Sequence, residues 1–420
     1  MVLGTVVGLL LSPTGAALVP EELADPIADW IALPGEIFLA LIQLVVVLLV
    51  ISSIVLGIAS GGNLTFLKKV GLRIGPYFVA TTVVAVIIGV VVATTIRPGD
   101  YVDPLLVEQS LGEPGGSVLT RPVMDDVSIP ERVLSVLPES PLGAVLDRAM
   151  LQIVVLAILL AIALLSIGEE RAKPLLDLLG TIQAVSLEVV AWAMRLAPFA
   201  VFGLIAQICI KIGVDAVLGM SAYVGAVLLG LALLMVFYLG IVLLIGRRSP
   251  WSFLAAARDA QLLAFSTSSS AAVMPISMQT AEEKLGVRRS IAQFIVPLGA
   301  TVNMDGTALY QVIAAIFLTQ VFGIELSSGE LVLLIATTVG ASIGSPSTPG
   351  VGIVILATIL AEFGVPGAGI ALILGVDRIL DMSRTVLNVT GDLAACVVMD
   401  RWIGADLDEE SPDEPVAVSA

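Results

Sequence analysis

Histidine is absent from the 420-residue chain, and only two cysteines are present. Without histidine, the protein has no imidazole metal ligand, no histidine general base and no histidine-based pH switch. The two cysteines, Cys209 and Cys396, both lie in apolar runs, which argues against a disulfide scaffold and a cysteine zinc site. The sequence therefore excludes catalysis by a histidine base and argues against metal sites built from histidine or cysteine.

Charged residues are also scarce: they make up 13% of the chain, against about 25% in an ordinary soluble domain. Hydrophobic residues make up 58%, so the sequence predicts a polytopic membrane protein whose main solvent is lipid. The 20 basic and 36 acidic residues give a net charge of −16. This balance argues against nucleic acid as a partner, because phosphates require a basic surface.

Six hydrophobic runs precede residue 250, and a helix needs about 20 apolar residues to cross a bilayer. The runs cover residues 1–19, 35–60, 74–96, 150–168, 176–205 and 219–246. The first begins at Met1 without a basic region, so we interpret it as a short span and not as a signal peptide.

Basic residues in the loops predict the orientation of these spans. They follow the second, fourth and sixth runs: Lys68, Lys69, Arg73, Arg171, Lys173, Arg247 and Arg248. Short basic loops face the cytoplasm, so both termini are expected there and the protein is expected in the plasma (inner) membrane. The acidic loop 97–148 then faces outside, with a short helix near Val133–Leu146. The acidic tail from Asp406 to Glu414 is expected to be solvated inside the cell.

Polar, turn-forming clusters interrupt the hydrophobic sequence after residue 250. Ala264–Pro275 reads AFSTSSSAAVMP, and Gly340–Gly352 reads GASIGSPSTPGVG. Unpaired backbone groups are costly in lipid, so such breaks persist only where they face protein or a water-filled cavity. The pattern predicts two helical hairpins that enter the membrane and turn back near its middle.

An apolar helix with an Asn/Asp cluster follows each predicted hairpin. The first cluster is Asn303–Thr307, which reads NMDGT, and the second is Asn388–Asp392, which reads NVTGD. A hairpin followed by a polar helix, occurring twice, is typical of the inverted repeats of secondary transporters.

The last predicted helix concentrates its polar residues on one face. At 100° per residue they share a stripe about 100° wide on an otherwise apolar helix. The stripe comprises Asp377, Asp381, Arg384, Thr385, Asn388 and Asp392. Charged residues inside a membrane usually face a functional cavity, so this stripe is the strongest candidate for a binding site.

The chemistry of the stripe indicates what it binds. The planar fork of Arg384 suits a carboxylate, and Asp381, one turn away, can pair with an ammonium group. An acidic amino acid carries both groups, and the hairpin tips offer backbone N–H donors for its α-carboxylate. The oxygen-rich Asn/Asp clusters suit a hard cation such as Na⁺ and offer nothing to a soft metal.

These segments resemble the glutamate/aspartate transporters, also called dicarboxylate/amino acid:cation symporters. The similar stretches are STSSSAAVMP at 266–275, PLGATVNMDGTALYQ at 297–311, STPGVG at 347–352 and DRILDMSRTVLNVTGD at 377–392. The order and spacing of the predicted elements agree over nearly the whole chain.

The resemblance implies an all-α membrane protein with eight transmembrane helices and two re-entrant hairpins, assembled as a homotrimer. A scaffold would hold the trimer together while a transport domain slides across the membrane as an elevator. The expected division is 1–70 scaffold, 71–97 transport domain, 98–215 outer loop and scaffold, 216–402 transport domain and 403–420 acidic tail.

The resemblance also implies roles for individual residues. Arg384 would bind the substrate side-chain carboxylate and Asp381 the amino group. The other implied substrate contacts are Ser269, Ser270, Thr307, Thr348, Gly352, Thr385 and Asn388. Two to three co-transported Na⁺ ions would be bound by Thr81, Thr82, Thr301, Asn303, Met304, Asp305, Ser342, Gly344, Asn388 and Asp392.

Some positions depart from relatives. Gln311 stands where proton-coupled animal members carry a glutamate, which favours sodium coupling without proton co-transport. An arginine found in relatives at the position of Ser268 or of Met382 is absent, and the second hairpin tip has Pro346 and Ser347 where many relatives have glycine and alanine.

The sequence also allows other functions. Neutral amino acid exchangers of the family typically have no arginine at the position of Arg384, and C4-dicarboxylate carriers typically have no aspartate at the position of Asp381. Both substrate classes stay as alternatives to aspartate or glutamate, and so does an anion-conducting channel. An enzyme is not expected, because Ser269, Ser270 and Asp305 have no histidine or nearby lysine to activate a nucleophile.

Overall fold

The computed structural model describes residues 2–13, 19–59, 64–102, 137, 140–146, 150–211, 214–342, 347, 350–365 and 368–408. Within these ranges every regular element is a helix and no strand occurs. The predicted all-α architecture is therefore confirmed. Thr348 and Gly344, two of the residues expected at the site, lie outside the described residues.

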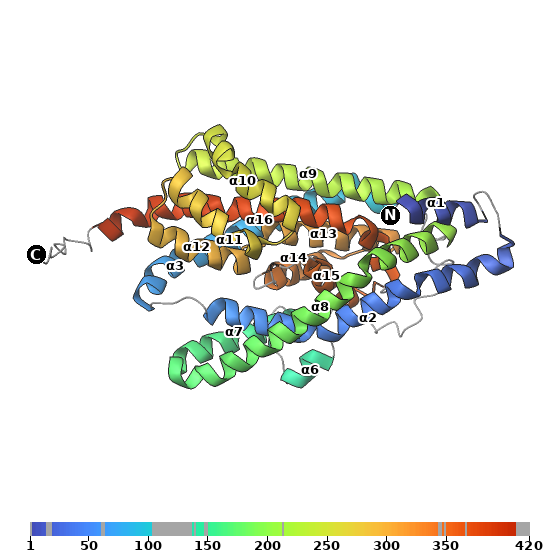
Figure 1. The fold of residues 1–420 in the computed structure, drawn as a ribbon, viewed down its shortest axis with the longest axis horizontal. Coiled ribbons are helices and arrows are strands. Elements are labelled where there is room, and N and C mark those ends of the chain that lie inside the picture. The colour runs from blue at the N-terminus through green and yellow to red at the C-terminus, as the bar shows by residue number, and fades with distance from the viewer. Residues whose placement is uncertain are drawn as a thin grey trace, which may run out of the picture.

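Long helices fill the first part of the chain (Figure 1). In order they are α1 (Val2–Leu11), α2 (Glu21–Ala59), α3 (Leu64–Ile96), the short η1 (Pro98–Tyr101), α6 (Pro141–Leu146), α7 (Met150–Ile167), α8 (Glu169–Lys211) and α9 (Val214–Leu244). The short helix expected near Val133–Leu146 appears as α6, and residues 133–136 lie outside the described part of the chain.

Shorter helices and one very long helix form the second part. They are α10 (Pro250–Thr267), α11 (Ser270–Gln279), the π-helical turn η3 (Thr280–Lys284), α12 (Arg289–Val302), α13 (Asp305–Val321), α14 (Ser328–Ser342), α15 (Val351–Glu362) and α16 (Ala368–Asp408). The breaks between α10 and α11 and between α12 and α13 fall within polar clusters of the sequence, whereas the cluster Asn388–Asp392 lies inside α16.

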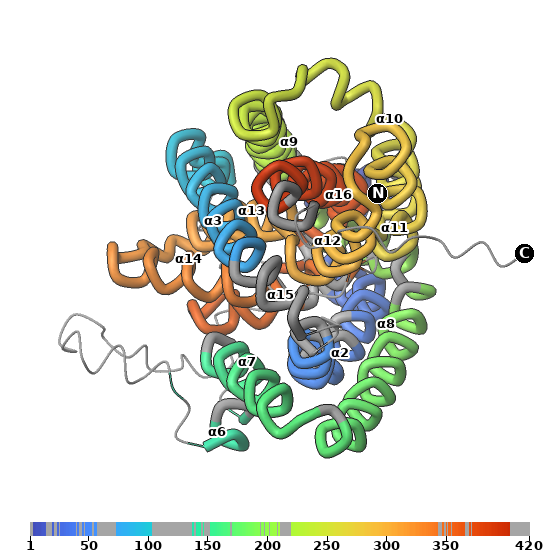
Figure 2. Tube along the Cα trace, turned by 90° about the vertical axis from the view of Figure 1, so that its left-hand side faces the viewer, coloured from blue at the N-terminus to red at the C-terminus, as the bar shows by residue number. Residues whose placement is uncertain are grey.

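Two groups of helices are visible along the long axis of the molecule. Helices α2, α7 and α8 lie together on one side, and α3, α9, α12, α13 and α16 lie together on the other (Figure 2). The α14 and α15 helices lie between them in the first view (Figure 1). Contacts between the groups include α8 on α16 and α2 on α12.

The surface and the interior have the polarity expected of a protein in lipid. Large apolar side chains are exposed, among them Leu44 at 71%, Val236 at 65% and Leu244 at 76% relative exposure, whereas Asp305 and Arg384 are buried. Three segments of the described chain are long and apolar enough to cross a membrane: Arg73–Tyr101, Glu170–Ala193 and Met220–Leu244. Shorter apolar helices, including Gln152–Ile167 and Ser328–Ser342, accompany them.

Several helix bounds differ from the hydrophobic runs. The α1 helix ends at Leu11 although the run continues to residue 19, and α8 extends beyond both ends of the run 176–205. A helix does not have to end where hydrophobicity ends, because its backbone hydrogen bonds are satisfied internally in water as well as in lipid. For the same reason α16 continues to Asp408, so residues 403–408 of the expected tail are helical.

The backbone is interrupted at two polar clusters in the second part. Ser268 has a positive φ of 53° and ends α10, while the hydroxyl of Ser269 accepts a hydrogen bond from the Ala272 N–H and caps α11. Asn303 and Met304 both have non-helical backbone and separate α12 from α13. Each break leaves backbone polar groups without helical partners at a point where polar side chains gather.

Candidate functional site

The polar stripe of α16 is buried along its whole length. Asp377, Asp381, Arg384, Thr385, Asn388 and Asp392 are each at most 6% exposed. The neighbouring Arg378 and Ile379 on the same helix are exposed. The helical periodicity therefore predicted the inward face of α16 correctly.

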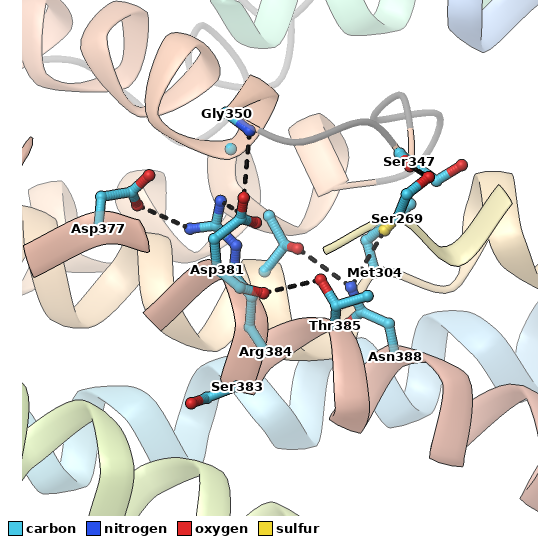
Figure 3. Close-up of polar contacts among 12 residues, drawn as sticks. Ser269, Met304, Ser347, Gly350, Asp377, Asp381, Ser383, Arg384, Thr385 and Asn388 are labelled. Carbon is cyan, nitrogen blue, oxygen red and sulfur yellow. Dashed lines mark hydrogen bonds and ion pairs between the residues drawn. The ribbon is translucent and has the colours of Figure 1, made fainter. Parts of the chain in front are cut away.

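Arg384 is held by two carboxylates of its own helix. Its Nη2 lies 2.8 Å from Asp381 Oδ1 and its Nη1 lies 3.2 Å from Asp377 Oδ1. Its guanidinium carbon lies 4.3 Å from the centroid of the Tyr310 ring on α13. Figure 3 shows both carboxylates facing the guanidinium, whereas Ser383 points away from the cluster. A buried cation paired and stacked in this way has a fixed orientation.

Asn388 joins α16 to the start of α13. Its amide nitrogen donates to the Thr307 hydroxyl at 3.2 Å and lies 3.2 Å from the Met304 sulfur. Its carbonyl oxygen accepts the Gly306 N–H at 2.8 Å. One turn earlier, the Thr385 hydroxyl donates to the carbonyl of Asp381 at 2.7 Å. The sequence-predicted Thr307, Thr385 and Asn388 are thus brought together.

The two broken helix pairs meet beside Arg384. The Ser269 hydroxyl donates to the carbonyl of Ser347 at 2.7 Å, and the Gly350 N–H donates to Asp381 Oδ2 at 3.2 Å (Figure 3). Gly352 lies directly against the arginine, since a Cβ atom built on it would lie 2.5 Å from Arg384 Nη2. Only glycine leaves room for the guanidinium at this position.

A small cavity lies at the centre of these groups. Its lining comprises Ser268, Ser270, Met304, Thr307, Ser347, Gly352, Asp381, Arg384, Thr385 and Asn388. The cavity has a volume of about 20 Å³, which holds about one water molecule. Of the expected substrate contacts, Ser269 is not in the lining and instead caps α11. A molecule larger than water enters only if surrounding groups move.

Deeper in the protein, Asp305 lies in a cluster of oxygen atoms. Its Oδ1 accepts a hydrogen bond from the Thr82 hydroxyl at 2.5 Å, and its Oδ2 accepts one from the Tyr238 hydroxyl. The amide of Asn303 donates to Asp392 Oδ1 at 3.1 Å. The Asn303 carbonyl oxygen is buried and has no hydrogen-bond partner within the described residues. An unpartnered buried acceptor beside carboxylates suits a hard cation.

The remaining predicted cation residues bond locally. The Thr81 hydroxyl donates to the Phe78 carbonyl at 3.0 Å, the Thr301 hydroxyl to the Leu298 carbonyl at 2.9 Å and the Ser342 hydroxyl to the Val339 carbonyl at 2.9 Å. Because each hydroxyl proton is directed to a carbonyl, the oxygen lone pairs of these side chains stay available to a ligand.

Three contributors to this site have no predicted role in the sequence analysis. Asp377 belongs to the polar stripe, but its ion pair with Arg384 is visible only in the folded chain. Tyr310 stacks on Arg384 from another helix, and Tyr238 reaches Asp305 from α9. In the sequence, each of these two tyrosines is a single aromatic hydroxyl among mostly apolar residues. Helical periodicity alone does not show which residue such a side chain contacts.

Together these features define a class of protein. Membrane-length helices surround a buried polar cavity, and residues at the interruptions between helices, among them Ser268 and Met304, line its wall. This combination is characteristic of secondary transporters, in which substrate and ions bind at broken helices between repeats.

Comparison with known proteins identifies the family. Residues 1–402 match the sodium:dicarboxylate symporter family, to which this chain belongs. The chain is therefore a membrane transporter and not an enzyme, as the sequence analysis expected.

Individual relatives align over most of their length. The chain is 37% identical over 404 residues to the proton/sodium-glutamate symport protein of Bacillus subtilis (strain 168), covering 96% of this chain and 91% of the relative. It is 34% identical over 379 residues to the proton/glutamate-aspartate symporter of Escherichia coli (strain K12), covering 89% and 86%. It is 34% identical over 385 residues to the C4-dicarboxylate transport protein of Rhodospirillum rubrum, covering 90% and 83%.

Proposed function

We propose that this protein is a sodium-coupled symporter that takes up L-aspartate or L-glutamate across the plasma membrane. The observation that carries the proposal is the buried Arg384–Asp381 pair, 2.8 Å apart at the wall of the central cavity. The two groups match the side-chain carboxylate and the amino group of one acidic amino acid. The glutamate and aspartate symporters named among its relatives support the same substrate class.

Binding in this scheme exchanges ion pairs within the protein for ion pairs with the substrate. The substrate carboxylate replaces Asp381 at Arg384, and the ammonium group of the substrate pairs with the freed Asp381. Ser270 and the N-terminal N–H groups of α11 receive the α-carboxylate. Since the cavity is much smaller than an amino acid, the segment around Ser347 and Gly352 has to move away to admit it.

Charge balance supports the coupling to two or three cations. Asp305, Asp377, Asp381 and Asp392 are buried with Arg384 as the one basic residue among them, which gives a formal charge of 1 − 4 = −3. An acidic amino acid adds one further negative charge. An excess of ionised carboxylates is costly to bury without counter-ions, so entry of cations with the substrate would balance this charge. Oxygen ligands at Asn303, Asp305 and Asp392 suit Na⁺.

Gln311 supports sodium over protons as the driving ion. Its amide donates to the Gly352 carbonyl at 3.1 Å, so it lies beside the segment that has to move. A glutamine cannot carry a proton across the membrane as a glutamate can. Coupling therefore relies on the cation sites.

The transport cycle we propose is an elevator within a homotrimer. Helices α1, α2, α7 and α8 correspond to the scaffold, and α3 and α9–α16 to the transport domain, with α10–α11 and α14–α15 as the re-entrant hairpins among eight spans. The separation of the two groups of helices in Figure 2 supports this division. Both termini are on the cytoplasmic side in this arrangement.

C4-dicarboxylates are the second candidate substrate, because relatives named as C4-dicarboxylate transport proteins align over most of the chain. A dicarboxylate has no ammonium group for Asp381. The buried carboxylate of Asp381, 5% exposed, would then face a second negative charge, which favours the amino acid.

Uptake into proteoliposomes tests the proposal. Purified protein is reconstituted, and labelled L-aspartate, L-glutamate and succinate are added under an inward Na⁺ gradient. We expect aspartate or glutamate to accumulate above its equilibrium level, and the accumulation to vanish when Na⁺ is equal on both sides.

Two comparisons separate the alternatives. A proton gradient without Na⁺ is expected to drive no uptake, and uptake under that condition would contradict sodium coupling. Accumulation of succinate in place of the amino acids would contradict the role of Asp381. Substrate that only equilibrates across the membrane would indicate a channel, since a channel cannot concentrate its substrate.

A further inference from the structure

Tyr238 occupies one side of the Asp305 carboxylate. Its hydroxyl donates to Oδ2, while the Thr82 hydroxyl lies 2.5 Å from Oδ1. All three side chains are completely buried. They come from α9, α3 and α13, so the contact depends on the packing of three helices.

The two hydroxyl groups differ in the acceptors available to them. Thr82 Oγ1 also lies 2.8 Å from the Phe78 carbonyl, so its proton can turn to that oxygen and leave its lone pairs, and Oδ1, to a cation. For the Tyr238 hydroxyl, Asp305 is the acceptor found within the described residues. The tyrosine hydroxyl therefore continues to donate to Oδ2 when a cation approaches.

Gly391 on α16 provides the space for this arrangement. A Cβ atom built on Gly391 would lie 2.5 Å from the Tyr238 hydroxyl oxygen and 2.9 Å from Asn303 Nδ2. The hydroxyl thus lies between Asp305 and the α16 backbone and close to Asn303, whose carbonyl oxygen is the unpartnered acceptor of the cluster.

We infer that Tyr238 is a positioning residue that sets ion selectivity at Asp305. By occupying Oδ2, its hydroxyl restricts the carboxylate to one-oxygen coordination of the cation through Oδ1, beside Thr82 and Asn303. Selectivity among hard cations depends on the size of the site, the number of ligands and their rigidity. A site with one fixed carboxylate oxygen, and with the space beside Oδ2 filled by the tyrosine hydroxyl, favours a small cation over a larger one. The inference rests on the proposed sodium coupling.

Cation-dependent thermal unfolding of the purified protein, without substrate, tests the inference independently of transport. Binding to the native state raises the midpoint temperature, and the stabilisation grows with the logarithm of one plus the ratio of ligand concentration to Kd. Na⁺ and K⁺ are titrated against choline at constant ionic strength. In the wild type we expect stabilisation at a lower concentration of Na⁺ than of K⁺.

Two variants remove the restraint in different ways. Tyr238→Phe deletes the hydroxyl, and Gly391→Ala displaces it without deleting it. Each frees Oδ2 and loosens the site, so the preference for Na⁺ over K⁺ is expected to fall by about tenfold, the effect of one hydrogen bond to a charged group. Tyr223→Phe is the matched control, because Tyr223 is also fully buried on α9 but is not bonded to Asp305.

The outcomes separate this inference from the proposed function. Absence of any Na⁺ stabilisation in the wild type would contradict sodium coupling itself. A wild type that responds to Na⁺, with the same ion preference in both variants, would overturn only the role of Tyr238. An equal loss of preference in Tyr223→Phe would also overturn it, because the effect would then belong to any buried hydroxyl of α9.

Discussion

At the scale of single residues, the proposed function assigns the recognition of a substrate carboxylate to Arg384. Replacing Arg384 by Cys removes the guanidinium that Asp377 and Asp381 share. We expect the apparent affinity for aspartate to fall by about 100-fold or more, as when one partner of a buried charge pair is lost. Uptake of labelled aspartate, with serine measured in parallel, checks this.

Arg378→Cys is the matched control, because Arg378 is an exposed arginine of the same helix. It should leave uptake close to the wild type. Uptake of serine by the Arg384→Cys variant would show that the variant is folded. Near-normal aspartate affinity in Arg384→Cys would exclude Arg384 as the carboxylate ligand.

The sequence alone placed the four cavity residues of α16 together because they lie on one face of one helix: Asp381, Arg384, Thr385 and Asn388. Helical geometry converts the spacing of Asp381, Arg384 and Asn388 directly into a shared direction. The Tyr310 ring on Arg384 and the Tyr238 hydroxyl on Asp305 come from other helices. Their contacts depend on how helices pack, which residue spacing does not encode.

At the scale of secondary-structure elements, the start of α15 fits closely over the arginine. Gly352→Ala would place a methyl group 2.5 Å from Arg384 Nη2 and 2.7 Å from its Cζ. Overpacking of this kind costs about 1–3 kcal/mol. We expect about a tenfold loss of apparent substrate affinity, measured by concentration-dependent uptake.

Gly225→Ala on α9 is the comparison variant, since a Cβ atom there meets nothing within 4 Å. Its uptake should equal that of the wild type. If Gly352→Ala transports with unchanged affinity, the start of α15 does not lie over Arg384 in the binding state, and the proposed contact between Gly352 and the substrate fails.

Breaks between elements were predictable, whereas helix ends were not. Serine-rich and glycine-rich clusters in an apolar sequence cannot continue a helix in lipid at low cost, so they located the interruption at Ser268 and the one near Ser347. The extension of α8 to Glu169 and Lys211 followed no hydrophobic signal, because a helix continues into water whenever its own residues allow it.

At the scale of the whole molecule, the proposed elevator mechanism requires α8 and α16 to slide past each other. Gly375 on α16 lies against Ile205 on α8, since a Cβ atom built on it would lie 2.6 Å from Ile205 Cγ1. Cysteines at these two positions, in a background without Cys209 and Cys396, are close enough for a disulfide to form on oxidation. The bond should stop uptake, and a reductant should restore it.

The counterpart is a cross-link inside the proposed transport domain. Gly89 on α3 lies against Val312 on α13, so a cysteine pair there is equally close but joins two helices that should move together. Oxidation of this pair should leave uptake unchanged. Because both bonds restrain local motion to a similar degree, only relative movement of the two groups of helices can make one inhibitory and the other silent. If both cysteine pairs inhibit uptake equally, or if neither inhibits it, rigid-body sliding along the α8–α16 contact is excluded. Release of the substrate would then depend on motion of the α14–α15 hairpin alone.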